Sequence, residues 1–295
     1  MGFDKATHQL PAPNIRPEAR PVHDPTKAGL FAFDIDGTVT AYGDLVPQRT
    51  RQALASLRQA GVAVIPATGR SVTGLLAIVE QLGLPDGWAV VSNGSLIGRL
   101  DSASPHGFVA EQLAHFNPAP LAQRVRQLYP SALFACEQAD GGWWATGQFP
   151  EGELHPPLAV RSFSEVVGSP VNRLVVRGLD IEPGALDEIM RQAVGVMAVT
   201  YQVGWTAWAD VTPHGVTKAS GLEIVRQRLG IAAQHTVAIG DGSNDESMLR
   251  WASRAAAVGS ASPSVRQAAT ENAPELAEQP VAWLAESVLS GLTGQ

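Results

Sequence analysis

Apolar runs of strand length alternate with helical patterns along the first third of the chain. Residues 29–35 form a short apolar run, which is typical of a strand buried on both faces. Ala53, Leu54 and Leu57 have helical spacing with arginines opposite, which predicts a helix over residues 48–60. The alternation continues with a strand over 61–68, a helix over 71–82 and a strand over 88–91. Strands that alternate with helices predict βαβ units and a parallel sheet.

The middle third of the chain has a different pattern. Residues 199–205 alternate in polarity, as a half-exposed antiparallel strand does. We expect further strands and two helices here, namely strands over 133–138, 143–147 and 173–177 and helices over 120–128 and 185–193. This part is therefore predicted to be α+β.

From Lys218 onward the first pattern returns. We expect helices over 219–229, around Met248 and over 282–289, and strands over 236–241 and 255–259. The predicted fold class is α/β, a Rossmann-like parallel-sheet core interrupted by an inserted α+β domain. The predicted division assigns residues 29–95 and 205–295 to the core, 96–204 to the insertion, and the proline-rich residues 1–28 to a disordered or extended segment.

Composition and charge exclude several function classes. The 295 residues carry a net charge of −7, which argues against a nucleic-acid binder because such proteins need a basic face. No apolar run has the length of a membrane span, and the first 25 residues hold five prolines and no apolar run, so no signal peptide is expected. A cytoplasmic monomer is the expectation. The single cysteine, Cys136, excludes an intrachain disulfide.

Three predicted strands are followed by polar motifs, and the carboxyl ends of parallel strands share one edge of a sheet. Residues 34–38 (Asp-Ile-Asp-Gly-Thr) place two carboxylates two positions apart, suited to a nucleophile and a general acid/base. Residues 68–70 (Thr-Gly-Arg) open a helix, where a hydroxyl and free N–H groups suit a phosphate. Strand-end aspartates in a turn and an ordinary threonine N-cap are the plain alternatives.

The third motif, residues 240–245 (Gly-Asp-Gly-Ser-Asn-Asp), offers carboxylate and amide oxygens to a hard cation such as Mg²⁺. The alternative is an acidic loop without a metal. Lys218 precedes a helix, and a lone lysine is usually a solvated surface charge, so only its place relative to the other motifs singles it out.

In this order, the residues resemble the four motifs of the haloacid dehalogenase superfamily of phosphohydrolases. Residues 34–38 match the first motif, Thr68 the second, Lys218 the third and residues 240–245 the fourth. The long insertion, the form of the fourth motif and the Pro-x-Gly-Val-x-Lys approach to Lys218 resemble the Cof-type branch, subfamily IIB. Val39 and Thr40 depart from the pattern, since leucines are usual there.

The resemblance implies Mg²⁺-dependent hydrolysis of a small phosphomonoester, such as a sugar phosphate or phosphorylated cofactor. Asp34 would form an aspartyl-phosphate, and Asp36 would act as general acid and base. Phosphate or substrate would be bound by Thr68, Gly69, Arg70, Lys218 and Asn244. The magnesium ligands would be the carboxylates of Asp34 and Asp241 and the backbone carbonyl of Asp36, with Asp245 completing or orienting the shell.

By the same resemblance, the insertion is a cap that closes over the core and selects the leaving group. Its tryptophans could stack on sugar rings or simply form the core of the cap; they are Trp143, Trp144, Trp205 and Trp208. Further candidate substrate contacts are Asn93, His155, Arg173 and His214.

Three other functions stay open at this point. A phosphomutase or phosphotransferase would use the same aspartyl-phosphate chemistry. A metal-dependent glycosyltransferase would explain residues 34–36 but leave Thr68, Lys218 and the acidic loop without a role. A receiver module is disfavoured because such domains are much shorter and lack a large insertion. A family member reduced to a phospho-ligand binding protein is disfavoured because every motif side chain is present. The expected partner is a small phosphorylated metabolite.

Overall fold

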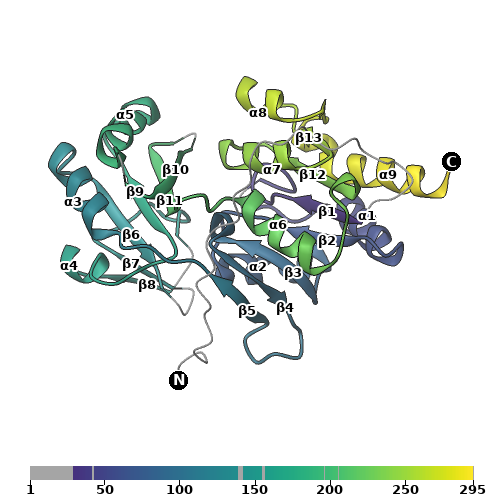
Figure 1. Ribbon diagram of the computed structural model, residues 1–295, viewed down its shortest axis with the longest axis horizontal. Coiled ribbons are helices and arrows are strands. Elements are labelled where there is room, and N and C mark those ends of the chain that lie inside the picture. The colour runs from purple at the N-terminus through teal and green to yellow at the C-terminus, as the bar shows by residue number, and fades with distance from the viewer. Residues whose placement is uncertain are drawn as a thin grey trace.

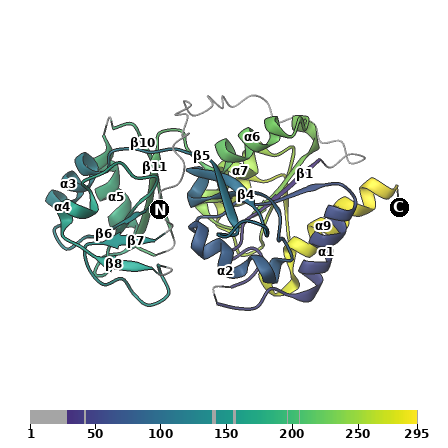
Figure 2. The same ribbon diagram turned by 90° about the horizontal axis from the view of Figure 1, so that it is seen from below.

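The computed structural model describes residues 29–41, 43–138, 142–154, 157–195, 197–204 and 206–294. The predicted N-terminal segment, residues 1–28, lies outside them. Figure 1 shows two lobes: one holds the strands from β6 (Leu133–Glu137) to β11 (Trp208–Pro213), and the other holds the remaining sheets and both ends of the described chain. A view from below shows the same separation (Figure 2).

The larger lobe is built on a five-stranded parallel sheet with the order β14-β13-β12-β1-β2. The strands are β1 (Leu30–Phe33), β2 (Ala63–Pro66), β12 (Thr236–Gly240), β13 (Arg254–Ala257) and β14 (Glu271–Asn272). From β1 the chain moves to β2 on one side, and later fills the other side from β12 outward. The order of the strands therefore reverses between β1 and β12, and such a switch point opens a crevice at the carboxyl ends of the strands.

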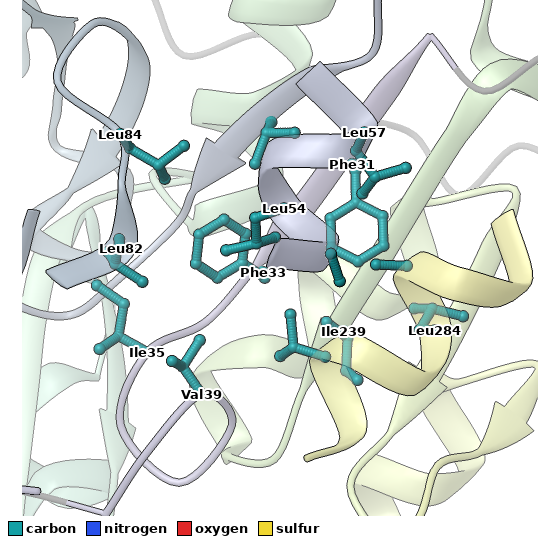
Figure 3. Close-up of a cluster of buried hydrophobic side chains, with 14 of the residues drawn as sticks. Phe31, Phe33, Ile35, Val39, Leu54, Leu57, Leu82, Leu84, Ile239 and Leu284 are labelled. Carbon is teal, nitrogen blue, oxygen red and sulfur yellow. The ribbon is translucent and has the colours of Figure 1, made fainter. Parts of the chain in front are cut away.

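Successive side chains of β1 point to opposite faces of this sheet and are buried on both. Phe31 and Phe33 pack on one side against α1 (Gln48–Gln59), α2 (Val72–Leu82) and α9 (Pro280–Thr293), as Figure 3 shows in part. Leu30 and Ala32 pack on the other side against α6 (Lys218–Arg228), α7 (Glu246–Trp251) and α8 (Pro263–Ala268). A strand that is covered on both faces has a continuous apolar run in its sequence, which is why residues 29–35 predict a buried strand.

A three-stranded antiparallel sheet extends this lobe. It consists of β3 (Gly87–Val91), β4 (Leu96–Leu100) and β5 (Phe108–Leu113), and a bridge from Ala67 to Val90 joins it to the end of β2. Leu96, Leu100 and Phe108 belong to the same hydrophobic cluster as Phe31. We therefore propose that the inserted domain begins after Leu113 and ends with Pro213, instead of covering residues 96–204.

The smaller lobe is a six-stranded sheet with the order β10-β11-β9-β6-β7-β8. Its strands are β6 (Leu133–Glu137), β7 (Trp143–Ala145), β8 (Leu158–Val160), β9 (Leu174–Arg177), β10 (Val199–Val203) and β11 (Trp208–Pro213). One face packs on α3 (Ala119–Leu128), α4 (Phe163–Val166) and α5 (Pro183–Val194). Side chains alternate along a strand, so Glu137, Asp210 and Thr212 lie on the opposite face from the helix-packed Cys136, Ala209 and Val211.

The predicted fold class is confirmed: a parallel α/β sheet is accompanied by an α+β unit of antiparallel character. Elements that are short or lie in stretches of mixed polarity were not predicted from the sequence; these are β4, β5, β8, β11, β14, α4 and α8. Among the described residues, no helix has the length and apolar character needed to cross a membrane.

Candidate functional site

Asp34 and Asp241 directly follow the two strands that flank the switch point. Asp34 comes after β1 and its backbone N–H donates to the carbonyl of Ile239 at 3.1 Å, so both loops leave the sheet side by side. Asp241 comes after β12, which pairs with β1 in parallel. Residues more than 200 positions apart are thereby brought to one edge, as Thr38 shows by donating from Oγ1 to Asp241 Oδ1 at 2.7 Å.

Gly37 allows this close approach. Its φ is +82°, in the region that favours glycine, and a Cβ added there would lie 2.3 Å from Asp241 Oδ2. Any side chain at position 37 would therefore push the Asp241 carboxylate out of the site. The glycine of the first motif is required by packing as well as by the turn.

Lys218 is the cation at the centre of the site. It is the first residue of α6, whose N-terminus is capped by Thr217 through a bond from Ser220 N–H to Thr217 Oγ1. Its ammonium is fully buried and donates to Asp34 Oδ1 and Asp245 Oδ1, both at 2.6 Å. Burial alone would lower the pKa of Lys218, but Asp245 and Asp34 raise it above its ordinary value, so the side chain stays charged.

Asp245 is fully committed to bonds within the site. Its Oδ1 accepts from Lys218, and its Oδ2 accepts from the backbone N–H groups of Asp241 and Gly242, both at 3.0 Å. These bonds hold the acidic loop against Lys218. The geometry therefore makes Asp245 the residue that orients the loop, while Asp34 Oδ2 and Asp241 Oδ2 have no hydrogen-bond partner among the described residues.

The donor set fits a divalent cation. Oxygens of Asp34, Asp241 and Asp245 lie within 4.8 Å of one another, and the Lys218 ammonium is shared by two of these three carboxyl groups. Burial raises the pKa of the Asp34 carboxyl well above its ordinary value, even though Lys218 lowers it. Burial, aided by Asp245, raises the pKa of Asp241 to about 6. A hard cation held by carboxylate oxygens would relieve this excess of buried negative charge.

Asp36 and Arg70 form an ion pair at the mouth of the site. Arg70 Nε donates to Asp36 Oδ2 at 2.8 Å and Nη2 to Asp36 Oδ1 at 2.6 Å. Arg70 Nη1 also donates to the carbonyl of Gly74 at 3.1 Å, so the side chain lies along the start of α2. The structure thus places Arg70, expected to contact phosphate, against the expected general acid/base.

The Thr-Gly-Arg turn lies beside the fourth motif, as expected from the parallel sheet. Thr68 is fully buried, and its Oγ1 accepts from the backbone N–H of Arg70 at 3.0 Å. Gly69 has no side chain to occupy the space where Asn93 and Asn244 meet, and Asn244 Nδ2 donates to Asn93 Oδ1 at 3.1 Å. Thr68, Gly69 and Asn244 are therefore gathered at the same edge as Asp34.

A small cleft, partly open to solvent, lies where the six-stranded sheet faces this edge. Its wall on the six-stranded sheet is formed by Thr200, Tyr201, Gln202, Asp210 and Thr212. Its opposite wall includes Asn93, Lys218 and Asn244. The wall on the six-stranded sheet was not predicted from the sequence, although polar and apolar residues alternate over 209–212 and could have indicated it.

Arg173 links the two lobes. Its Nη1 donates to the carbonyl of Gly69, and its Nε donates to Asp210 Oδ1 at 2.6 Å. Nearby, Ser92 Oγ donates to the buried Glu137 carboxylate at 2.7 and 2.9 Å, and burial raises the pKa of Glu137. The structure thus places Arg173 between the lobes and beside the cleft wall.

The other candidates from the insertion lie elsewhere. Trp143 and Trp208 pack in a hydrophobic cluster with Phe149, which matches the simpler expectation that they form the core of this unit. Trp144 is 37% exposed and lies outside the cleft lining, and His214 is exposed. His155 and Trp205 lie outside the described residues.

Comparison with known proteins gives consistent matches. The model of the haloacid dehalogenase-like hydrolase family matches residues 31–284. The HMP-PP phosphatase of Klebsiella pneumoniae (strain 342) is 26% identical over 81% of this chain and 87% of its own length. The 5-amino-6-(5-phospho-D-ribitylamino)uracil phosphatase YcsE of Bacillus subtilis (strain 168) is 25% identical over the same shares of the two chains.

A solved sugar phosphatase of subclass IIB, BT4131, superposes with a TM-score of 0.73 at 20% identity, covering 88% of this chain and 98% of its own. At that identity the likeness shows the fold. Together with the family match over most of the chain, it confirms the resemblance found in the four motifs: this chain belongs to the haloacid dehalogenase-like hydrolases and is an enzyme of their phosphatase group, of the Cof type.

Proposed function

We propose that this enzyme hydrolyses a small phosphomonoester through an aspartyl-phosphate on Asp34. One observation supports this most strongly: a buried carboxylate at the switch point is held by a buried lysine within a cluster of acidic residues. Phosphoryl transfer needs positioning and neutralisation of charge more than elaborate covalent chemistry. This arrangement supplies both around one candidate nucleophile.

In the first half-reaction, an oxygen of Asp34 forms a bond to phosphorus while the bond from phosphorus to the leaving oxygen breaks. Asp36 gives its proton to that oxygen, so the leaving group departs as an alcohol. In the second half-reaction, Asp36 takes a proton from water as the water oxygen attacks phosphorus. Phosphate is released, and the Asp34 carboxylate is regenerated.

Asp36 must separate from Arg70 to serve as acid and base, because Arg70 occupies both of its oxygens. Rotation about the side-chain torsions of Asp36 would break the pair and turn its carboxyl toward Asp34. Asp36 retains the freedom to move because its side chain is 38% exposed. We propose that the Asp36–Arg70 pair is the resting arrangement of the general acid.

The remaining motif residues would hold the transferred group. Lys218 offsets the negative charge of Asp34 and of the phosphoryl oxygens, while Thr68, the N–H of Gly69 and Asn244 would donate to those oxygens. Mg²⁺, which favours oxygen ligands, would be held by Asp34, Asp241 and the backbone carbonyl of Asp36, with Asp245 orienting the loop. When bound, it supplies further neutralisation of phosphate charge.

The substrate class is proposed to be a sugar phosphate or a phosphorylated cofactor, since one relative is named as a phosphatase of 5-amino-6-(5-phospho-D-ribitylamino)uracil. The inserted domain would act as a cap that excludes water and selects the leaving group. The cytoplasmic location and the monomeric state predicted from the sequence stay predictions.

The test is steady-state phosphate release from a panel of small phosphomonoesters, with Mg²⁺ and then with EDTA. Linear release over many turnovers, lost in EDTA and restored by Mg²⁺, supports the proposal and excludes a receiver module. Transfer of phosphate to a second sugar hydroxyl, without release to water, would instead indicate a phosphotransferase or phosphomutase. No turnover by the folded, Mg²⁺-supplied protein would contradict hydrolysis.

A further inference from the structure

We propose that the cleft between the lobes is a subsite for an uncharged, hydroxyl-rich leaving group, read by Asn93 on one wall and Asp210 on the other. The inference rests on the proposed phosphatase function and deepens it. It assigns a donor and an acceptor to the part of the substrate that departs as an alcohol.

Asn93 provides the donor. Its side chain lines the cleft and the residue is only 5% exposed, yet its Nδ2 has no hydrogen-bond partner within the described part of the chain. Its Oδ1 is fixed by Asn244 at 3.1 Å, so the direction of the amide is set. A buried N–H₂ without a partner is energetically unfavourable, and a substrate oxygen would supply the missing acceptor.

The backbone around Asn93 is shaped to present that amide. Asn93 has a φ of +54°, which asparagine tolerates better than most residues. Its N–H donates to the carbonyl of Thr68 at 3.1 Å, which ties it to the phosphate-binding turn. A Cβ on Gly69 would lie 3.2 Å from Asn93 Oδ1, so the glycine leaves the space that the amide occupies.

Asp210 provides the acceptor. Arg173 donates from Nε to Oδ1 at 2.6 Å and its Nη2 lies 2.6 Å from the same oxygen, while Oδ2 has no hydrogen-bond partner among the described residues. Asp210 lines the cleft from β11, on the face of the six-stranded sheet that faces Lys218. Arg173 keeps this carboxylate in place and leaves one oxygen for a hydroxyl of the substrate.

The charges of the cleft exclude a second anionic group. Lys218 is the only cation among its described lining residues, and its ammonium is already shared by Asp34 and Asp245. Arg173 is likewise engaged by Asp210 and the carbonyl of Gly69. A leaving group that carries its own phosphate would meet the Asp210 carboxylate with no free cation to offset the repulsion.

The lining also disfavours an apolar leaving group. Val216 is the only purely hydrocarbon side chain among the described residues of the cleft, and apart from Lys218 the others offer hydroxyl, amide or carboxylate groups. Burying an alkyl chain here would desolvate these groups without giving them partners, which costs free energy. Hydroxyl groups, which both donate and accept, match the walls.

Three esters with the same number of carbon atoms test the subsite: a ribitol phosphate esterified at a terminal carbon, n-pentyl phosphate and n-pentyl diphosphate. We expect kcat/KM for the ribitol ester to exceed that for the pentyl ester by at least about tenfold, with the diphosphate slowest. Equal values for the first two, or a preference for the diphosphate, overturn the subsite while leaving the phosphatase function intact. Failure to release phosphate from any ester overturns both.

Two variants assign the preference to its residues. Asn93→Gly removes the amide and tolerates the positive φ, and Asp210→Asn alters the acceptor with little change in shape. We expect each to lower the ratio of kcat/KM between ribitol and pentyl esters by at least about fivefold. Asp180→Asn, which changes an aspartate that accepts from Tyr129 outside the cleft, is the matched control and should keep the wild-type ratio. If Asp210→Asn fails to fold, Asn93→Gly decides alone, and a wild-type ratio in that folded variant overturns the assignment.

Discussion

Lys218 Nζ lies 2.6 Å from Asp34 Oδ1, and the two side chains are 0% and 7% exposed although 184 positions separate them in the sequence. A buried pair of this kind contributes little net stability, because both charges lose their hydration. We propose that its value lies in function, because it would hold a carboxylate ready at the switch point and keep one positive charge within reach of a phosphoryl group.

Asp34→Asn tests the nucleophile. The amide cannot form an aspartyl-phosphate, so we expect phosphate release to fall by at least about a thousandfold, while the fold is retained because the substitution removes a buried charge instead of adding one. Phosphate release and the far-ultraviolet circular dichroism spectrum measure the two effects. A folded variant with even about a tenth of wild-type activity would rule out Asp34 as the nucleophile.

Lys218→Met should affect both activity and stability. Removing the ammonium leaves Asp34 and Asp245 buried without their cation, which we expect to lower the free energy of unfolding by about 3–5 kcal/mol. Activity should fall by about a hundredfold or more. Urea unfolding and steady-state kinetics give the two values, and a normal rate in the folded variant would remove Lys218 from the site.

The raised pKa of Asp241 predicts how metal binding depends on pH. Because its folded value is about 6 and its ordinary value is 3.8, the metal-free protein is favoured by protonation of this group at low pH and loses that contribution as the pH rises through about 6. A metal needs the ionised carboxylate, so Mg²⁺ should raise Tm clearly at about pH 7.5 and little at about pH 5.

Asp241→Asn is the control for that experiment. We expect the metal-free variant to unfold at a higher temperature than the wild type at about pH 7.5, by an amount corresponding to on the order of 1–3 kcal/mol, and to lose most of the response to Mg²⁺. Thermal melts with and without Mg²⁺ measure both. The same Mg²⁺-induced shift at both pH values in the wild type would contradict a role for Asp241 in binding the ion.

Arg173→Met should loosen the contact between the lobes. The substitution removes the donor to the Gly69 carbonyl and leaves the Asp210 carboxylate without its counter-charge. We expect a loss of about 3 kcal/mol in the free energy of unfolding and faster amide exchange around residues 68–70. Hydrogen exchange followed by mass spectrometry tests this. Unchanged exchange in that turn would show that the bond to Gly69 does not hold the lobes together.

Cys136 should be inert in the native protein. It is fully buried in the six-stranded sheet, and burial raises the pKa of its thiol to about 12. At about pH 8 the thiolate fraction is therefore negligible, and a thiol reagent should label Cys136 only after denaturation. Rapid labelling without denaturant would show that this sheet opens readily.

The parallel-sheet core and the polar motifs at its edge could be predicted from local patterns in the sequence. Strands buried on both faces leave apolar runs such as residues 29–35, and the polar motifs directly follow those runs. Since the carboxyl ends of parallel strands share an edge, the convergence of Asp34, Thr68 and Asp241 followed from local patterns alone. The family match over residues 31–284 agrees with that inference.

The partners of these residues could not be predicted from the sequence. In the folded chain Arg70 pairs with Asp36, both oxygens of Asp245 accept hydrogen bonds, and Asn93 and Asp210 lie on opposite walls of one cleft. The strands β4 and β5 also pack onto the core, because Leu96 and Phe108 lie in the same hydrophobic cluster as Phe31. Ion pairs and cleft walls depend on side chains from distant segments meeting in space, and their free energies come from burial and geometry that no local sequence pattern encodes.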